Sequence, residues 1–313
     1  MNTPERHLPL LAALLLAAVA FGCGQKEIVC PAGGQLRLSV AFEWDKAPGA
    51  RVEGMTLYFF PEDDGGKIWR FDIAGSEGGA VDIPAGNYRM IAVNNDLPGV
   101  TFSGAGTFAT FSANAVPVGG DSLLMPTGTL YSAVVDHIAF TPCGVTYSKP
   151  DGCSKECPAG LVRCSPDTAS VVYNVYIRSV DGLERLKSAV ASINGVASSL
   201  TLCDDATGSG SGAIVLRLAA ASGFQLAGST SGFDTANVPV TLTLTVVRTD
   251  GKAFTKKFNI SRHALNHGTA HHVDIYIDEM DIPDYSDSPG GDDGDDVDMS
   301  VIVDGWNVIE IDL

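Results

Sequence analysis

Seven cysteines are the residues of this sequence with the widest choice of chemistry, because a thiol can form a disulfide, bind a metal ion or carry a lipid. With Cys23 set aside, six candidates for disulfide formation remain: Cys30, Cys143, Cys153, Cys157, Cys164 and Cys203. Four of them lie between residues 143 and 164, separated by nine, three and six residues. Zinc sites prefer closely paired cysteines, so disulfides are the favoured interpretation and zinc the weaker one. Six cysteines allow 15 pairings, and the sequence does not select among them.

Histidines near the C-terminal end form the group that most suggests a metal site. They are His263, His267, His271 and His272, with Asp274 and Asp278 nearby. Asn266 and Gly268 would interrupt a helix that placed two histidines on one face, so a polar loop with solvated histidines is favoured. The acidic run 292–296 lacks the ligand spacing and the closing glutamate of a calcium loop. We therefore expect no metal and no cofactor.

Sequence motifs for catalysis and for nucleic-acid binding are not found. The chain has no Gly-x-Ser-x-Gly, no His-Glu-x-x-His and no glycine-rich phosphate loop. Its formal net charge of −17 offers no basic surface for nucleic acid. We expect a protein that is not an enzyme and has no nucleic-acid partner.

The first 22 residues have the three-part layout of a secretory signal. Arg6 precedes an apolar run, Leu8 to Gly22, which is shorter than the roughly 20 residues that cross a bilayer. The small residues before Cys23 resemble the lipobox of bacterial lipoproteins, which implies cleavage after Gly22 and a lipid on Cys23. An ordinary secretory signal, with Cys23 as a thiol, is the alternative. We expect an exported protein whose contact with the membrane is this lipid.

Alternation of apolar and polar residues is the dominant pattern, and it predicts β-strands. The strand patterns cover Leu36–Trp44, Met55–Phe59, Trp69–Ile73, Tyr88–Val93, Ser122–Leu130, Ala133–Phe140, Val171–Ile177, Ile214–Leu218, Val238–Val246, Phe254–Ile260 and Val273–Ile277. Hairpin turns are predicted at Asp63–Gly66 and Thr249–Lys252. Apolar residues at helical spacing predict one short helix over 183–193, which ends at Asn194-Gly195.

Many short strands in a chain of this length indicate an all-β fold with two β-sandwich domains in tandem. The expected order is a signal peptide (1–22), a tether (23–34), a first sandwich (35–141), a Cys-rich connection (142–165), a second sandwich (166–280), an acidic linker (281–298) and a C-terminal strand (299–313). The linker consists mainly of Asp, Gly, Ser and Pro, so we expect it to be solvated.

The C-terminal strand carries its apolar residues on one predicted face. These residues are Val301, Val303, Ile309, Ile311 and Leu313. Asp304, Glu310 and Asp312 lie on the other face. The strand either closes its own sandwich, which is favoured because connections within a chain are commoner, or is donated to a neighbouring subunit.

Several segments together carry a resemblance to a known family. They are the lipobox at Cys23, the strand pattern that follows it, and the stretches Arg51–Pro61, Gly86–Asn95 and Leu186–Leu200. In these features the chain resembles the fimbrillin-like lipoproteins of Bacteroidales, the subunits and anchors of type V pili and their relatives. The resemblance implies two transthyretin-like Greek-key sandwiches, a lipid-anchored location in the outer membrane or at the cell surface, and other fimbrial subunits or surface proteins as partners.

Processing of the first loop is also implied by this resemblance. Pilus subunits of the family are cut by an arginine- or lysine-specific protease after the first strand, which opens a groove for a neighbour's strand, whereas anchor subunits keep the lipid and stay uncut. Lys46 and Arg51 lie in the corresponding loop and are the candidate processing residues. We therefore expect a structural, anchor, tip or accessory subunit of a fimbria that assembles through strand pairing. A surface lipoprotein that binds a glycan or a host protein through its sandwich loops is the alternative.

Overall fold

The computed structural model describes residues 34–284, with gaps at 64, 120–121, 149–153, 158–159, 222, 237–238, 261–265 and 270. Strands dominate this part of the chain, and no α-helix occurs in it. Its two helical elements are single 3-10 turns, η1 (Phe108–Thr110) and η2 (Leu183–Arg185). The predicted all-β fold is confirmed.

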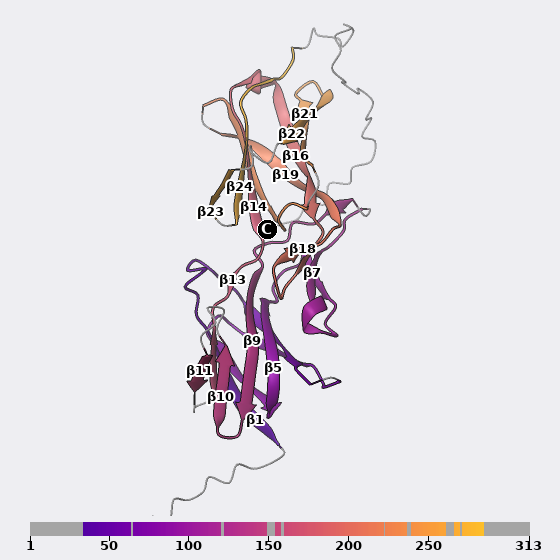
Figure 1. Cartoon of the computed structure of the whole chain (residues 1–313). Helices are drawn as coiled ribbons and strands as arrows, with labels where there is room; N and C mark the ends of the chain where they lie inside the picture. Colours follow the sequence, from indigo (N-terminus) through magenta and orange to yellow (C-terminus); the bar gives the residue numbers. More distant parts are fainter. Residues whose placement is uncertain are drawn as a thin grey trace, which may run out of the picture. The chain divides into compact units, whose positions relative to one another are not determined.

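The N-terminal half of the described chain builds a three-stranded and a seven-stranded sheet (Figure 1). In the smaller sheet, β1 (Gln35–Phe42) lies parallel to β12 (Leu161–Cys164) and antiparallel to β4 (Gly78–Pro84). The larger sheet has the order β11-β10-β9-β5-β2-β3, with β13 beside β9. Its strands are β2 (Gly54–Pro61), β3 (Trp69–Ala74), β5 (Gly86–Asn94), β9 (Tyr131–Thr141), β10 (Gly144–Ser148), β11 (Ser154–Cys157) and β13 (Asp167–Thr168).

Strand alternation explains the core between these two sheets. Leu38 and Val40 of β1 are buried in the same apolar cluster as Leu57 and Phe59 of β2. This is the result expected when successive side chains of a strand point to opposite faces of a sheet. The intervening Tyr58 packs on the other side of β2, against a second apolar cluster. β2 is therefore buried on both faces.

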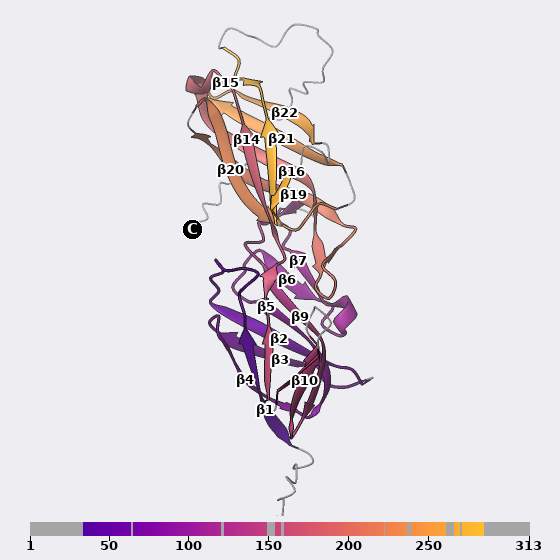
Figure 2. The ribbon, with the colours of Figure 1, turned by 60° about the vertical axis from the view of Figure 1, so that its left-hand side comes forward.

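The C-terminal half builds a nine-stranded sheet in the order β22-β21-β16-β19-β20-β14-β24-β23, with β8 beside β19 (Figure 2). Its strands are β8 (Leu123–Leu124), β14 (Val171–Ile177), β16 (Leu186–Ala197), β19 (Ser211–Ala221), β20 (Gln225–Gly232), β21 (Val240–Arg248), β22 (Ala253–Ile260), β23 (Asn266–Thr269) and β24 (His272–Ile277). β19 pairs with β16 and, through Ala219–Ala221, with β20. Tyr173 of β14 and Leu242 of β21 consequently share one buried cluster.

Two further small sheets complete the described fold. One has the order β18 (Ala206–Thr207), β17 (Ser199–Thr201), β7 (Ser112–Ala115) and β6 (Val100–Ser103). The pairing of β7 with β17 joins segments that lie almost 90 residues apart in the sequence. The other sheet pairs β15 (Val180–Asp181) with β25 (Met280–Asp281).

The predicted helix over 183–193 is wrong. Only Leu183–Arg185 forms a helical turn, and Leu186–Ala197 is the strand β16. Ala189, Ala191 and Ile193 are buried at a period of two, because β16 lies between β19 and β21 and covers the core with one face. Leu183, Leu186, Val190 and Ile193 have a helical spacing, and Ala189, Ala191 and Ile193 have a strand spacing. The same segment therefore fitted both a period of 3.6 and a period of two.

Strands also replace two segments that were predicted to be irregular. The Cys-rich connection contains β10, β11 and β12, which extend the two sheets of the N-terminal half. The acidic linker was expected from residue 281, but Asp281 belongs to β25 and Ile282 is fully buried. Conversely, a predicted strand is mostly irregular. Ser122–Leu130 was predicted to be one strand, but only Leu123–Leu124 forms a strand.

Candidate assembly interface

β1 is the element that joins the N-terminal segment to the body of the protein. Its backbone is paired on both sides, with β4 along seven residues and with β12 along four. Further hydrogen bonds join the Ser39 amide to the Gly160 carbonyl and the Glu43 amide to the Cys164 carbonyl, both at 2.8 Å. Loss of β1 would expose two strand edges together with the apolar residues that face Leu38 and Val40.

The loop after β1 holds both candidate processing residues at the surface. Trp44 fixes its start, because its indole Nε1 donates to the Ser76 carbonyl at 2.7 Å. Ala47 is buried and takes part in two turn hydrogen bonds. Lys46 and Arg51 are exposed on either side of it. The sequence therefore placed both residues correctly in an exposed loop, and cleavage there stays a prediction.

The two basic residues of this loop differ in their surroundings. Lys46 Nζ lies 3.5 Å from a carboxylate oxygen of Asp167, which follows β12. The other oxygen of Asp167 lies 3.5 Å from His271 Nε2. Arg51 is exposed, and no ion pair is seen for it among the described residues. An ion pair at such an exposed position contributes little stability, but it restrains the Lys46 side chain.

The predicted disulfides of Cys164 and Cys203 are wrong, since both carry free thiols. Cys164 is buried in the cluster beneath β1, and Cys203 packs against the other apolar cluster, so the two cannot meet. Burial, followed by the charge of Glu43, raises the pKa of Cys164 from 9.0 to about 12. Cys143 is disulfide-bonded, as predicted. Cys23, Cys30 and Cys153 lie outside the described residues, and the side chain of Cys157 is not described.

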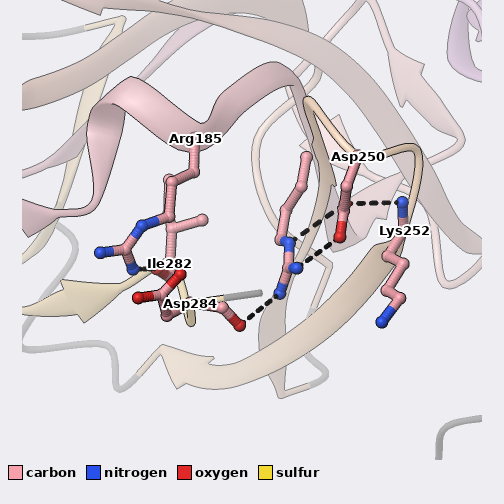
Figure 3. A network of polar contacts seen from close by, with 6 residues as sticks. Arg185, Asp250, Lys252, Ile282 and Asp284 are labelled. Carbon is pink, nitrogen blue, oxygen red and sulfur yellow. Dashed lines mark hydrogen bonds and ion pairs between the residues drawn. The ribbon is translucent and has the colours of Figure 1, made fainter. Parts of the chain in front are cut away.

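A polar network fixes the last described residues (Figure 3). Arg185 Nη1 donates to the Ile282 carbonyl at 2.6 Å, and Arg248 Nη1 donates to the Asp284 carbonyl at 3.2 Å. The buried Arg248 guanidinium also binds the carboxylate of Asp250, which accepts the Lys252 amide at 3.0 Å. Sequence reasoning missed this network, although the Asp-Gly turn that contains Asp250 was predicted. The C-terminal strand residues Val301, Val303, Ile309, Ile311 and Leu313 lie outside the described residues.

Ligand sites of other kinds are not evident in the described part of the chain. No group of three or more His, Cys, Asp or Glu side chains there could hold a metal ion. Of the large apolar side chains described, Phe224 at 72% and Tyr276 at 37% are the exposed ones. They come from a hairpin tip and from a strand, so they do not form an aromatic cluster on one loop. A helix long and apolar enough to cross a bilayer is likewise not found among these residues.

Comparison with known proteins gives a family and a fold. The family described as "Domain of unknown function (DUF5119)" matches residues 22–216, which is more than half of the chain. A curated relative from Bacteroides ovatus, described as a proposed fimbrium anchoring subunit, Fim4B, is 24% identical over 146 residues. That match spans 44% of this chain and 41% of the relative, so less than half of the relative's length is covered.

Two solved structures share the fold. A proposed adhesin from Bacteroides ovatus superposes with a TM-score of 0.60 at 15% identity, over 84% of this chain and 99% of the adhesin. A protein from Bacteroides thetaiotaomicron, described as one of the proposed polysaccharide-binding proteins (DUF1812), gives a TM-score of 0.52 at 14% identity. The superposition covers 77% of this chain and 90% of the Bacteroides thetaiotaomicron protein. Identities this low show similarity of fold alone.

Proposed function

The chain belongs to the DUF5119 family, and from this premise we propose that it is a lipid-anchored surface protein that serves as an anchor, tip or accessory subunit of a fimbria. The resemblance to fimbrillin-like proteins of Bacteroidales, predicted from the sequence, is confirmed by the family match and the fimbrial relative. The proposed fimbrial role does not depend on any catalytic feature of the chain. It is supported by the relative described as an anchoring subunit and by the strand arrangement at β1.

The observation that carries the proposal is the position of β1. The strand is central in its sheet, fills the core with Leu38 and Val40, and is followed by an exposed loop with two basic residues. A strand of this kind can be exchanged for a neighbour's strand, because main-chain hydrogen bonds and alternating apolar side chains are independent of which chain supplies them. Assembly through strand pairing at this position is our proposed mode.

Membrane attachment belongs to the same proposal. A lipid on Cys23 would hold the chain at the outer membrane, and residues 24–34 would link it to β1. In an anchor subunit the loop would remain uncut, and β1 would tie the body of the protein to the lipid. In a polymerising subunit, cleavage at Lys46 or Arg51 would separate β1 and the lipid from the body of the protein. The two β-sandwich domains that we propose, residues 35–141 and 166–280, would fold before either outcome.

A deletion experiment tests the fimbrial role. We expect that bacteria lacking the gene lose fimbriae from their surface or release them into the medium, and that the wild-type gene restores attachment whereas the Cys23→Ala variant does not. Fimbriae are counted by electron microscopy on cells and in the cell-free medium. An unchanged number, length and attachment of fimbriae in the deletion strain would refute the role.

The alternative function, capture of a glycan or a host protein, has less support in the structure. The described residues offer no cluster of aromatic side chains on one loop, which glycan capture through sandwich loops would favour. The polysaccharide-binding description belongs to a protein that shares only the fold. Binding of the purified chain to a glycan array, together with unchanged fimbriae in the deletion strain, would establish the alternative in place of our proposal.

A further inference from the structure

β22 is the longest edge strand in the described part of the chain. It has eight residues and pairs there with β21 alone, at the end of the nine-stranded sheet. The outer side of an edge strand presents unpaired N–H and C=O groups, which can accept a further strand. Edge strands in natural proteins are normally short, covered by another segment or protected by charge.

The two faces of β22 specify what could cover it. Phe254 and Phe258 are half-buried and pack against the core at its margin, so the apolar cluster is incompletely covered there by the described residues. Lys257 is exposed, and Lys256 Nζ lies 5.4 Å from the centroid of the Phe258 ring. Two adjacent lysines are a local positive site on a chain with 20 Lys and Arg against 37 Asp and Glu. An apolar and acidic strand would match this edge.

The polar network of Figure 3 places the end of the described chain beside this edge. Arg248, the last residue of β21, holds the Asp284 carbonyl, and only the short turn with Asp250 separates Arg248 from β22. The chain after Asp284 therefore starts next to the hairpin that leads into β22.

We propose that β22 is the docking edge for the C-terminal strand of the same chain, residues 301–313. In that strand Val301, Val303, Ile309, Ile311 and Leu313 lie on one predicted face, and the other predicted face carries Asp304, Glu310 and Asp312 together with Ile302 and Val308. With its apolar face beside Phe254 and Phe258, the strand directs Glu310 and Asp312 to the face of β22 that carries Lys257. Main-chain hydrogen bonds to the open edge and apolar burial at the margin of the core stabilise the docked strand.

The connecting segment is long enough for this docking. Residues 285–300 separate Asp284 from the strand, and a flexible chain of that length has a root-mean-square span of about 20–24 Å. β22 itself is about 27 Å long at 3.4 Å per residue. The linker thus reaches any position on the edge, and a tether of matching span gives the strand a high effective concentration there. Docking within the chain is favoured over docking to a second copy for this reason.

Photo-cross-linking of the full mature chain tests the proposal. Asn259→p-benzoylphenylalanine, and separately Thr255→p-benzoylphenylalanine, place a photoreactive side chain on β22. The protein is irradiated as an equal mixture of ¹⁴N- and ¹⁵N-labelled chains, and the cross-linked peptides are identified by mass spectrometry. We expect residues 299–313 to be captured from both positions, in peptides whose two halves carry the same isotope. Capture of other residues alone would overturn the proposal, and mixed-isotope peptides would overturn it in favour of donation to a second copy.

Charge reversal provides a matched pair of variants. Lys257→Glu should lower the cross-link yield about two- to fivefold, as expected for loss of one opposite-charge pair between strands. Arg217→Glu reverses an exposed charge on β19 of the same sheet and should leave the yield unchanged. Equal yields in these two variants would contradict docking guided by Lys257. The inference goes beyond the fimbrial role, because it concerns the isolated chain, and its failure would leave that role intact.

Discussion

At the residue scale, two buried tyrosines differ in a single hydrogen bond. Tyr173 Oη donates to the Phe233 carbonyl at 2.8 Å, whereas Tyr147 Oη has no partner among the described residues. A buried hydroxyl without a partner loses its hydration and gains nothing in return. We expect Tyr173→Phe to lower the free energy of unfolding by about 1 kcal/mol, and Tyr147→Phe to leave it unchanged or raise it slightly. Urea unfolding of both variants measures this difference, and equal losses would contradict it.

A second residue-scale prediction concerns the two free thiols. Burial raises the pKa of Cys164 to about 12, so almost no thiolate forms near neutral pH. Burial and then Asp204 also raise the pKa of Cys203, but its thiol is only half-buried and can be reached by a reagent. Native protein at pH 8 should react with iodoacetamide at Cys203 and not at Cys164, and both should react after unfolding in urea. Peptide mass spectrometry identifies the alkylated residues. Rapid native labelling of Cys164 would show that β12 opens readily.

The same shift in pKa has a consequence for stability in alkaline solution. The unfolded chain releases the Cys164 proton near pH 9.0, but the folded chain retains it up to about pH 12. Because the folded state binds more protons in this window, stability is intact below pH 9 and falls as the pH rises through it. Cys164→Ala should show a shallower fall than the wild type in urea unfolding between pH 8 and 10.5. Identical slopes would contradict the shift.

The cysteines also show what the sequence could not reveal at this scale. An even count of cysteines besides Cys23, in a chain predicted to be exported, favoured disulfides, and Cys143 is bonded. Nothing in the local sequence indicated that Cys164 would point into one apolar cluster and Cys203 would pack against another, because the position of each follows from strands paired over long distances. Lys46 and Arg51 were easier to place, since an exposed loop between two alternating patterns is a local feature.

At the scale of elements, the Arg248 network predicts a specific loss of stability. Arg248 is buried and binds both a carboxylate and a backbone carbonyl, and hydrogen bonds of charged groups contribute about 1.5–3 kcal/mol. Arg248→Gln should lower the free energy of unfolding by about that amount. The control Arg217→Gln, at an exposed position of β19, should change it by less than about 0.5 kcal/mol. Urea denaturation compares the two variants, and a similar effect of both substitutions would refute the stabilising role of the Arg248 network.

The loop after β1 gives a prediction for limited proteolysis. Trypsin should cut the native protein after Arg51 before it cuts after Lys46, because Lys46 is paired with Asp167 and precedes the buried Ala47. Arg51→Gln should therefore slow the first cleavage severalfold, whereas Lys46→Gln should leave it almost unchanged. Electrophoresis and mass spectrometry of the fragments follow both variants. First cleavage at Lys46 would contradict this account of the loop.

Elements with clear alternation were predictable, and those that depend on distant partners were not. The strand patterns that begin at Leu36, Met55 and Val171 correspond to β1, β2 and β14. β16 was mistaken for a helix because Leu183, Leu186, Val190 and Ile193 also fit a period of 3.6. β10, β11 and β12 were missed because they are short and lie in a segment with many Cys, Gly and Ser residues. They become strands through pairing with β9 and β1. Tertiary context decides such segments.

At the scale of the whole molecule, the lipid that we propose on Cys23 would decide the location of the protein. We expect Cys23→Ala to move the protein from the membrane fraction to the soluble fraction and to abolish labelling by a fatty-acid analogue, since the acyl chains are the membrane contact that we propose. A control substitution in the same segment, Gln25→Ala, should leave both unchanged. Fractionation and metabolic labelling measure the outcome, and a membrane-bound Cys23→Ala variant would disprove this attachment.

The pairing of β1 with β12 sets an order of events during biogenesis. Ser39 lies opposite Leu161, 122 residues later in the chain, so the parallel partner of the first strand is made long after the strand itself. At synthesis rates of 5–20 residues per second, this interval is roughly 6 to 24 s. Until then β1 has only β4 beside it, and its other edge has no strand partner. The first strand of the described chain thus gains its second neighbour late, which leaves a period in which a strand of another chain can compete for that neighbour's position.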